Sequence, residues 1–164
     1  MENRIVHDSS MREMFQFSCG LPQTKLKIAD IGSRGSQNYA AFFTKPGWEY
    51  VGMDMQPGTN VHRVLAEPYA WPNVLNGEFD VLISGQCMEH VPMPWRWMKE
   101  LARITKPGGT LCIIGPHSWE YHPSPLDCWR IWPDGMKACM EDAGLKVEKC
   151  WKNENDTVGI ARKG

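Results

Sequence analysis

The sequence lacks the charge bias that nucleic-acid binding requires. Its 164 residues carry 18 Lys and Arg against 19 Asp and Glu, a net charge of −1, with no basic block. Proteins that bind phosphate backbones normally present a clustered positive surface. We therefore expect no nucleic-acid partner, and nothing in the charge balance indicates an acidic partner or a membrane surface.

The sequence also lacks a long hydrophobic run. No segment approaches the roughly 20 apolar residues that cross a bilayer, and residues 1–20 contain no continuous apolar signal region. We therefore expect no membrane association and a cytoplasmic location. The length is that of about one domain, so we expect a single domain over residues 1–164, in which residues 1–24 form a leading helix and a linker.

Closely spaced metal ligands are missing as well. Six cysteines are present, but no two of them form a C-x-x-C pair. Structural zinc sites usually draw on closely paired ligands of that kind. A site built from His117, His122 and Cys128 has suitable ligand types but no recognised spacing, so the sequence predicts no bound metal.

What the chain does contain is an alternation of strands and helices. Apolar runs bounded by Gly, Pro or Asp predict strands, and apolar residues at helical spacing predict helices. The alternation predicts an α/β fold with a mainly parallel sheet, right-handed crossovers and a closing antiparallel hairpin. The expected strands are 26–30, 49–54, 61–65, 79–84, 110–115, 146–151 and 157–162, and the expected helices are 8–20, 38–43, 95–104 and 133–143.

The first strand runs into a glycine-rich turn. Residues 26–36 read LKIADIGSRGS, an apolar run that ends in an acid and breaks into glycine. Gly32 and Gly35 can adopt positive φ or allow a ligand to approach the main chain closely. Free backbone N–H groups at the start of a following helix favour a nucleotide-like ligand there. A purely conformational turn is the alternative interpretation.

Three strands end in polar residues. In an open parallel sheet, the ligand crevice lies at the carboxyl ends of the strands. Asp30 closes the first strand and Asp54 the second, 24 positions later, about the spacing at which nucleoside-binding folds place an acid on the ribose. A carboxylate suits that diol because it offers several lone pairs. The segment Ser84-Gly85-Gln86 closes the fourth strand.

Four segments together resemble class I S-adenosylmethionine-dependent methyltransferases: IADIGSRG, YVGMD, FDVLISGQCMEHV and ELARITKPGGTLCIIGP. The most specific part is the order of strand, Glu-His, amphipathic helix, K-P-G-G and strand. More narrowly, HDSS and DCWRIWPDGMKACMEDAGL are similar to small methyltransferases found among glycan and natural-product genes. The resemblance implies a Rossmann-like seven-stranded sheet and S-adenosylmethionine as the methyl donor, with S-adenosylhomocysteine as the product.

The resemblance also implies a role for individual positions. Asp54 would bind the ribose, Met55 would lie against the adenine, and Glu67 would accept the adenine amino group. The methionine moiety would lie against Asp30, Gly32, Ser33, Arg34 and Gly35, and the sulfonium beside Ser84, Gly85 and Gln86. Arg34 and Ser36 replace two glycines of the family's D-x-G-x-G-x-G turn, so Arg34 either reaches the donor carboxylate or crowds the loop.

A general base is needed only for some acceptors. Methyl transfer from a sulfonium requires in-line positioning and exclusion of water, and a hydroxyl acceptor adds the need for a base. His117 and His90 are the candidate bases, with structural roles as the alternative. The loop at 116–133 is long enough to favour a functional role, and its candidate acceptor-binding residues are Trp119, Tyr121, His122 and Arg130. A loop-bracing ion pair with Asp127 is the competing interpretation of Arg130.

These features predict a methyltransferase for a small-molecule acceptor, with an oxygen atom of a saccharide or related metabolite favoured as the target. N-methylation of a small amine and a binding protein without turnover, acting as a regulatory or partner subunit, are the alternatives. Small methyltransferases without a cap domain often complete the acceptor pocket by dimerising, so we expect a homodimer.

Overall fold

The computed structural model describes residues 8–35 and 38–164, so His7 of the HDSS segment and Ser36 of the glycine turn lie outside the described residues. The strands are β1 (Leu26–Ile31), β2 (Trp48–Asp54), β3 (Arg63–Val64), β4 (Phe79–Gly85), β5 (Thr105–Pro116), β6 (Leu145–Lys152) and β7 (Asp156–Lys163). The helices are α1 (Asp8–Gly20), α2 (Pro94–Ile104) and α3 (Pro133–Asp142), with short 3-10 turns η1 (Ala40–Phe42) and η2 (Met88–His90).

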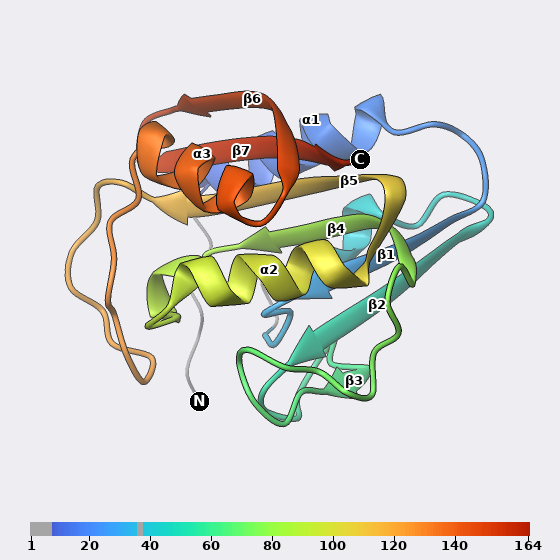
Figure 1. The fold of residues 1–164 in the computed structure, drawn as a ribbon, viewed down its shortest axis with the longest axis horizontal. Coiled ribbons are helices and arrows are strands. Elements are labelled where there is room, and N and C mark those ends of the chain that lie inside the picture. The colour runs from blue at the N-terminus through green and yellow to red at the C-terminus, as the bar shows by residue number, and fades with distance from the viewer. Residues whose placement is uncertain (1–7, 36–37) are drawn as a thin grey trace.

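The seven strands form one sheet in the order β3-β2-β1-β4-β5-β7-β6. Strand β7 runs antiparallel to both of its neighbours, and the other pairs are parallel. Helices α2 and α3 cover one face and α1 lies behind the other (Figure 1). The predicted α/β class, with a Rossmann-like sheet and an antiparallel C-terminal hairpin, is confirmed.

The buried strand β4 explains how the two layers hold together. Its apolar run is buried on both faces, as expected of a central parallel strand. Leu82 belongs to the core beneath α2 and α3, whereas Val81 and Ile83 belong to the core that includes Met14 of α1. In the part of the chain that the structure describes, no helix is long and apolar enough to cross a bilayer.

Two expected elements are shorter than predicted. The helix expected at 38–43 is only the 3-10 turn η1, because six residues offer too few backbone hydrogen bonds to offset the cost of starting an α-helix. The strand expected at 61–65 pairs only at Arg63 and Val64, since Val61 is held in a turn by the Gly58 carbonyl. Strand β5 begins earlier than expected, at Thr105, and its register with β4 shifts between Phe79 and Val81.

Helix α1 is fixed to the carboxyl edge of the sheet by buried polar contacts. The Ser9 hydroxyl donates to Asp156 Oδ2 at 2.7 Å, and Gln86 Nε2 donates to Asp156 Oδ1 at 2.8 Å. The Ser10 and Tyr39 hydroxyls form a hydrogen bond of 2.6 Å. Buried, fully bonded groups of this kind fix one arrangement because each loses its partner if the elements slide. Helix α1 therefore positions the end of β4 and the start of β7.

Glu78 binds side chains from the starts of β1 and β3. Arg63 donates two hydrogen bonds to its carboxylate, at 2.7 and 3.0 Å, and Lys27 donates a third at 2.8 Å. The hydrogen bonds from Arg63 are the main reason that the pKa of Glu78 falls from 4.5 to about 2. A carboxylate whose pKa is lowered on folding stabilises the protein above its unfolded pKa and loses that effect as the pH falls.

We expect Glu78→Gln to lower the free energy of unfolding by about 1–3 kcal/mol at neutral pH. The stability of the variant falls less steeply than that of the native protein as the pH drops from about 5 to about 2, because the titrating carboxylate is gone. Urea unfolding at a series of pH values measures both effects. Glu148→Gln, which removes an exposed partner of Arg162, is the control and costs much less; equal losses in the two variants would contradict this account.

Gly85 is required by the close packing of Tyr39. A Cβ at Gly85 would lie 2.0 Å from the Tyr39 hydroxyl oxygen, whereas a Cβ at Gly115 would meet its nearest neighbour, an Ile131 methyl group, at 3.4 Å.

We expect Gly85→Ala to lower the free energy of unfolding by about 1–3 kcal/mol through overpacking and Gly115→Ala to lower it much less. Thermal unfolding of the two variants tests the difference, and Gly85→Ala as stable as Gly115→Ala would show that Tyr39 does not occupy this position.

Candidate functional site

The sheet order brings three polar strand ends to one edge. Strand β1 pairs with β2 on one side and β4 on the other, with Asp30 opposite Gly52 and Ile83. All three strands are parallel, so their carboxyl ends open on the same side. The glycine turn, Asp54 and Gln86 therefore lie along one edge, as predicted for a crevice at the strand ends.

The turn after β1 is built against β2 and the loop that follows β2. Gly32 has φ of 81° and Gly35 has φ of 135°, both in the region that favours glycine. The backbone N–H groups of Gly32 and Ser33 donate to the Met53 carbonyl at 2.8 and 3.2 Å. The Ser33 hydroxyl donates to the Asn60 carbonyl at 2.9 Å. The turn is thus held from behind, and its conformation requires the glycines.

Asp54 joins the turns that follow β1 and β2. Its Oδ2 accepts the Arg34 N–H at 3.3 Å, and its Oδ1 accepts the Gln56 N–H at 3.0 Å. The aliphatic part of the Arg34 side chain packs closely on the same loop. A Cβ added at Gly58 would lie only 2.8 Å from Arg34 Cγ. The Arg34 stem therefore runs along the loop after β2.

The remaining cofactor candidates differ in exposure. Asp30 is buried and accepts the Tyr50 hydroxyl at 2.6 Å. Met55 is 49% exposed next to Asp54, so an apolar surface is available beside the carboxylate. Glu67 has an exposed side chain, and its carbonyl accepts the Trp71 indole N–H at 2.7 Å. These positions leave Met55 and Glu67 accessible from outside.

The end of β4 is more enclosed. Ser84 is buried and donates its hydroxyl to the Ile31 carbonyl at 2.7 Å, while Gly85 lies beneath Tyr39. Gln86 has φ of 55°, a left-handed conformation that non-glycine residues rarely adopt. Such strain is found where the surrounding structure fixes a functional position, and here the bond from Gln86 to Asp156 fixes it. The sequence analysis gave Asp156 no role.

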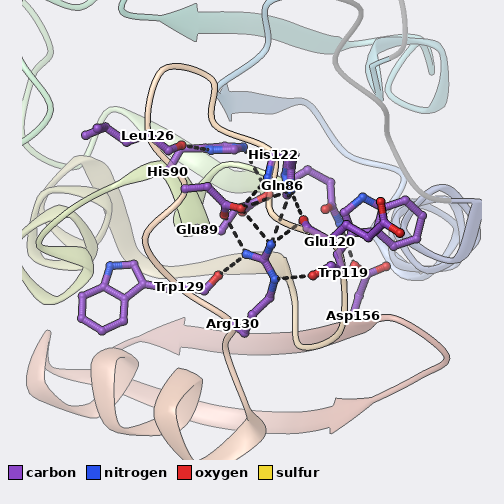
Figure 2. Close-up of polar contacts among 11 residues, drawn as sticks. Gln86, Glu89, His90, Trp119, Glu120, His122, Leu126, Trp129, Arg130 and Asp156 are labelled. Carbon is purple, nitrogen blue, oxygen red and sulfur yellow. Dashed lines mark hydrogen bonds and ion pairs between the residues drawn. The ribbon is translucent and has the colours of Figure 1, made fainter.

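The long loop after β5 is organised by Arg130. Its guanidinium donates to both oxygens of Asp127, at 2.7 and 2.8 Å, and to the carbonyls of Trp119 and Glu120, at 3.0 and 2.7 Å (Figure 2). The pairing with Arg130 holds the pKa of Asp127 far below its usual range. The loop-bracing ion pair considered from the sequence is therefore present, and it closes the segment around the guanidinium.

His117 and His90 have different surroundings. The structure places His117 against the β6–β7 turn, where Nε2 forms a hydrogen bond with the Asn153 carbonyl at 3.1 Å. Its ring packs on Trp132, with ring centroids 5.1 Å apart. His117 Nδ1 is buried and has no hydrogen-bond partner among the described residues. His90 instead lies against His122, with ring centroids 5.1 Å apart, and beside the fully buried Glu89. The sequence analysis did not predict this group.

Two hollows lined by described residues bear on the place of the site. One of about 550 Å³ is lined by Ser118, Trp119, Glu120 and Asn155, beside the carboxyl edge. A larger one of about 800 Å³ lies at the opposite edge, against α1 and the starts of β4 and β5, where Asp80 and 106–110 line it. Trp119 and Tyr121 are exposed, which leaves aromatic surface available beside the smaller hollow. We assign the site to the carboxyl edge because the strand-end polar groups converge there.

Comparisons with known proteins concern the family and the fold of the chain. The sequence profile of a family described as "Methyltransferase domain" matches residues 29–113, more than half of the chain. An uncharacterized methyltransferase of Mycolicibacterium gilvum is 30% identical over 118 residues, which cover 65% of this chain and 45% of the relative. The chain thus spans less than half the length of that relative.

Solved structures show the same fold at low identity. A SAM-dependent methyltransferase from Aquifex aeolicus superposes with a TM-score of 0.72 at 16% identity, covering 93% of this chain and 89% of the other. The Burkholderia thailandensis 1,6-didemethyltoxoflavin-N1-methyltransferase, with bound S-adenosylhomocysteine, gives 0.72 at 15% identity and covers 93% and 77%. The matched segment includes the glycine turn, Asp54 and the end of β4. Because the family profile matches more than half of the chain, the chain belongs to the methyltransferase domain family.

Proposed function

We propose that the protein transfers a methyl group from S-adenosylmethionine to a small-molecule acceptor at the carboxyl edge of β1, β2 and β4. The observation that carries this proposal is the contact between Asp54 and the Arg34 N–H. It places a partly exposed carboxylate directly beside the positive-φ glycine turn. The pair provides an acceptor for the ribose diol next to a backbone that a ligand can approach closely.

The donor would extend along this edge. The turn around Gly32 and Gly35 receives the methionine moiety, Asp54 the ribose, and Met55 and Glu67 the adenine. The sulfonium lies near the end of β4, where Gln86 is held by Asp156. Because a sulfonium already carries an activated methyl group, the main contribution of the protein is to position donor and acceptor in line and exclude water.

For the acceptor, the loop after β5 favours an oxygen atom of a saccharide or related metabolite. The 550 Å³ hollow beside Trp119 lies at this edge, and aromatic rings offer a flat apolar surface to a sugar ring. His117 is the candidate base for an oxygen acceptor because its Nε2 pairs with the Asn153 carbonyl, so its lone pair lies on Nδ1. This atom is buried, and the proposal requires that it becomes accessible when the acceptor binds. We also propose that a second subunit completes the acceptor site, as exposed Trp119 and Trp132 suit an interface.

N-methylation of a small amine is the second candidate. The Burkholderia thailandensis neighbour has the same fold and is named as an N1-methyltransferase. A neutral nitrogen acceptor needs no general base. A donor-binding protein without turnover is the third candidate, because a fold alone does not establish chemistry. A screen of small acceptors for S-adenosylhomocysteine release separates the three.

Calorimetric titration with S-adenosylmethionine tests the donor site. We expect the native protein to bind and Asp54→Asn to bind about 10–100-fold more weakly, because a neutral amide is a poorer acceptor for the diol. Asp80→Asn is the matched control: this carboxylate lies at the start of β4 and pairs with Lys106 at 2.7 Å. No heat with the native protein, or equal weakening in both variants, would reject the assignment.

Turnover measured against pH tests the base. With a hydroxyl acceptor, we expect His117→Gln to lower kcat by about 10²–10⁴-fold and to remove the acidic limb of the pH profile. Binding of S-adenosylmethionine should stay unchanged, since His117 lies at the β6–β7 turn. An unchanged rate would exclude His117 as the base and favour the nitrogen acceptor.

A further inference from the structure

A second group of side chains on the same edge has the composition of a metal site. Glu89, His90 and His122 each offer one ligand atom, and these atoms lie within 4.8 Å of one another. Glu89 and His90 come from η2, directly after β4, and His122 comes from the loop after β5. Figure 2 shows the three side chains gathered above Arg130. The fold therefore joins residues that are 32 positions apart.

The hydrogen bonds of His90 prepare one of its nitrogens for a cation. His90 Nδ1 pairs with the Leu126 carbonyl, so Nδ1 carries the hydrogen and the neutral ring keeps a lone pair on Nε2. That nitrogen lies 3.5 Å from Glu89 Oε1. Either a proton or a metal ion between these two atoms relieves the repulsion of their lone pairs, and a metal ion does so while the imidazole stays neutral. An imidazole that donates its other N–H to a carbonyl is also the usual outer-shell arrangement of a metal-bound histidine.

The surroundings of Glu89 differ from those of the neighbouring acid. The Asp127 carboxylate is buried and accepts two hydrogen bonds from Arg130. The Glu89 side chain is fully buried as well, and its Oε1 faces His90 Nε2. A carboxylate that lies next to imidazole nitrogens offers a suitable ligand atom to a divalent transition ion.

We propose that Glu89, His90 and His122 bind a divalent first-row transition ion of the zinc type. Two imidazoles and one carboxylate form a ligand set of open metal sites, in which a fourth position takes water or a substrate oxygen. The distance of 3.5 Å between Glu89 Oε1 and His90 Nε2 is close to the separation of two ligand atoms that each lie about 2 Å from a common ion. This ligand set is not the set of His117, His122 and Cys128 considered from the sequence. Cys128 is exposed and is not one of the three ligands.

The ion would fasten the loop to the sheet. The Cys128 N–H donates to the Glu89 carbonyl at 2.7 Å, so the backbone of the loop already contacts η2. Coordination of His122 adds a second attachment on the other side of Leu126. Binding to the native state alone stabilises it by mass action, so the ion raises the midpoint of thermal unfolding and protects the segment 117–132 from proteolysis.

Metal titration of the whole protein, without S-adenosylmethionine, tests this site. After dialysis against a chelator, we expect Zn²⁺ and Co²⁺ to bind with one ion per chain and Mg²⁺ to give no heat. Glu89→Gln and His122→Asn should each weaken Zn²⁺ binding by at least about 10-fold. His122 is a partly exposed loop residue, so His122→Asn keeps the test valid if Glu89→Gln fails to fold.

Two controls separate this site from other ligands. Cys128→Ser and His117→Gln should bind Zn²⁺ as the native protein does, and the Co²⁺ spectrum should lack thiolate charge-transfer bands. Absence of stoichiometric binding, unchanged affinity in His122→Asn, or thiolate bands that vanish in Cys128→Ser would overturn the proposal. Because no donor is present, the outcome is independent of whether the protein binds S-adenosylmethionine.

Discussion

The candidate site depends first on the parallel pairing of β1 between β2 and β4. This pairing sets Asp30 at the centre of the edge and brings the ends of both neighbours beside it. The backbone bonds from the glycine turn to the Met53 carbonyl and from Arg34 to Asp54 then join two adjacent turns into one surface. A slip of β2 by one residue would turn Asp54 to the other face of the sheet, because side chains alternate along a strand.

A second constraint, the guanidinium of Arg130, shapes the other half of the site. It gathers carbonyls from both ends of the long loop and holds Asp127 ionised. Asp127 in turn accepts the backbone N–H of His122 at 2.8 Å, so the ion pair also places the histidine that faces His90. The donor half is thus built from strand ends, whereas the acceptor half is built from a braced loop. Helix α1 joins the two halves through Asp156, which binds Ser9 and Gln86.

The sequence predicted the features that local patterns encode. The buried run of β4, the glycines at positive φ and the acid at the end of β2 follow from strand chemistry and backbone sterics, and the structure has each of them. Three features depend on the path of a long loop and on η1: the proximity of Glu89 and His122, the covering of Gly85 by Tyr39, and the place of His117 at the β6–β7 turn. No periodicity encodes such paths. The six-residue helix was predicted where the chain makes only a 3-10 turn, because short segments follow tertiary packing rather than propensity.

The central claim is that the donor lies on the carboxyl edge, although the larger hollow lies at the opposite edge. Amide chemical shifts of the ¹⁵N-labelled protein, recorded during titration with S-adenosylhomocysteine, distinguish the two places directly. The account predicts that the largest changes occur at Gly32, Gly35, Met55 and Gln86. Changes concentrated at Gly108, Gly109 and Thr110, with the strand-end amides unmoved, would contradict it.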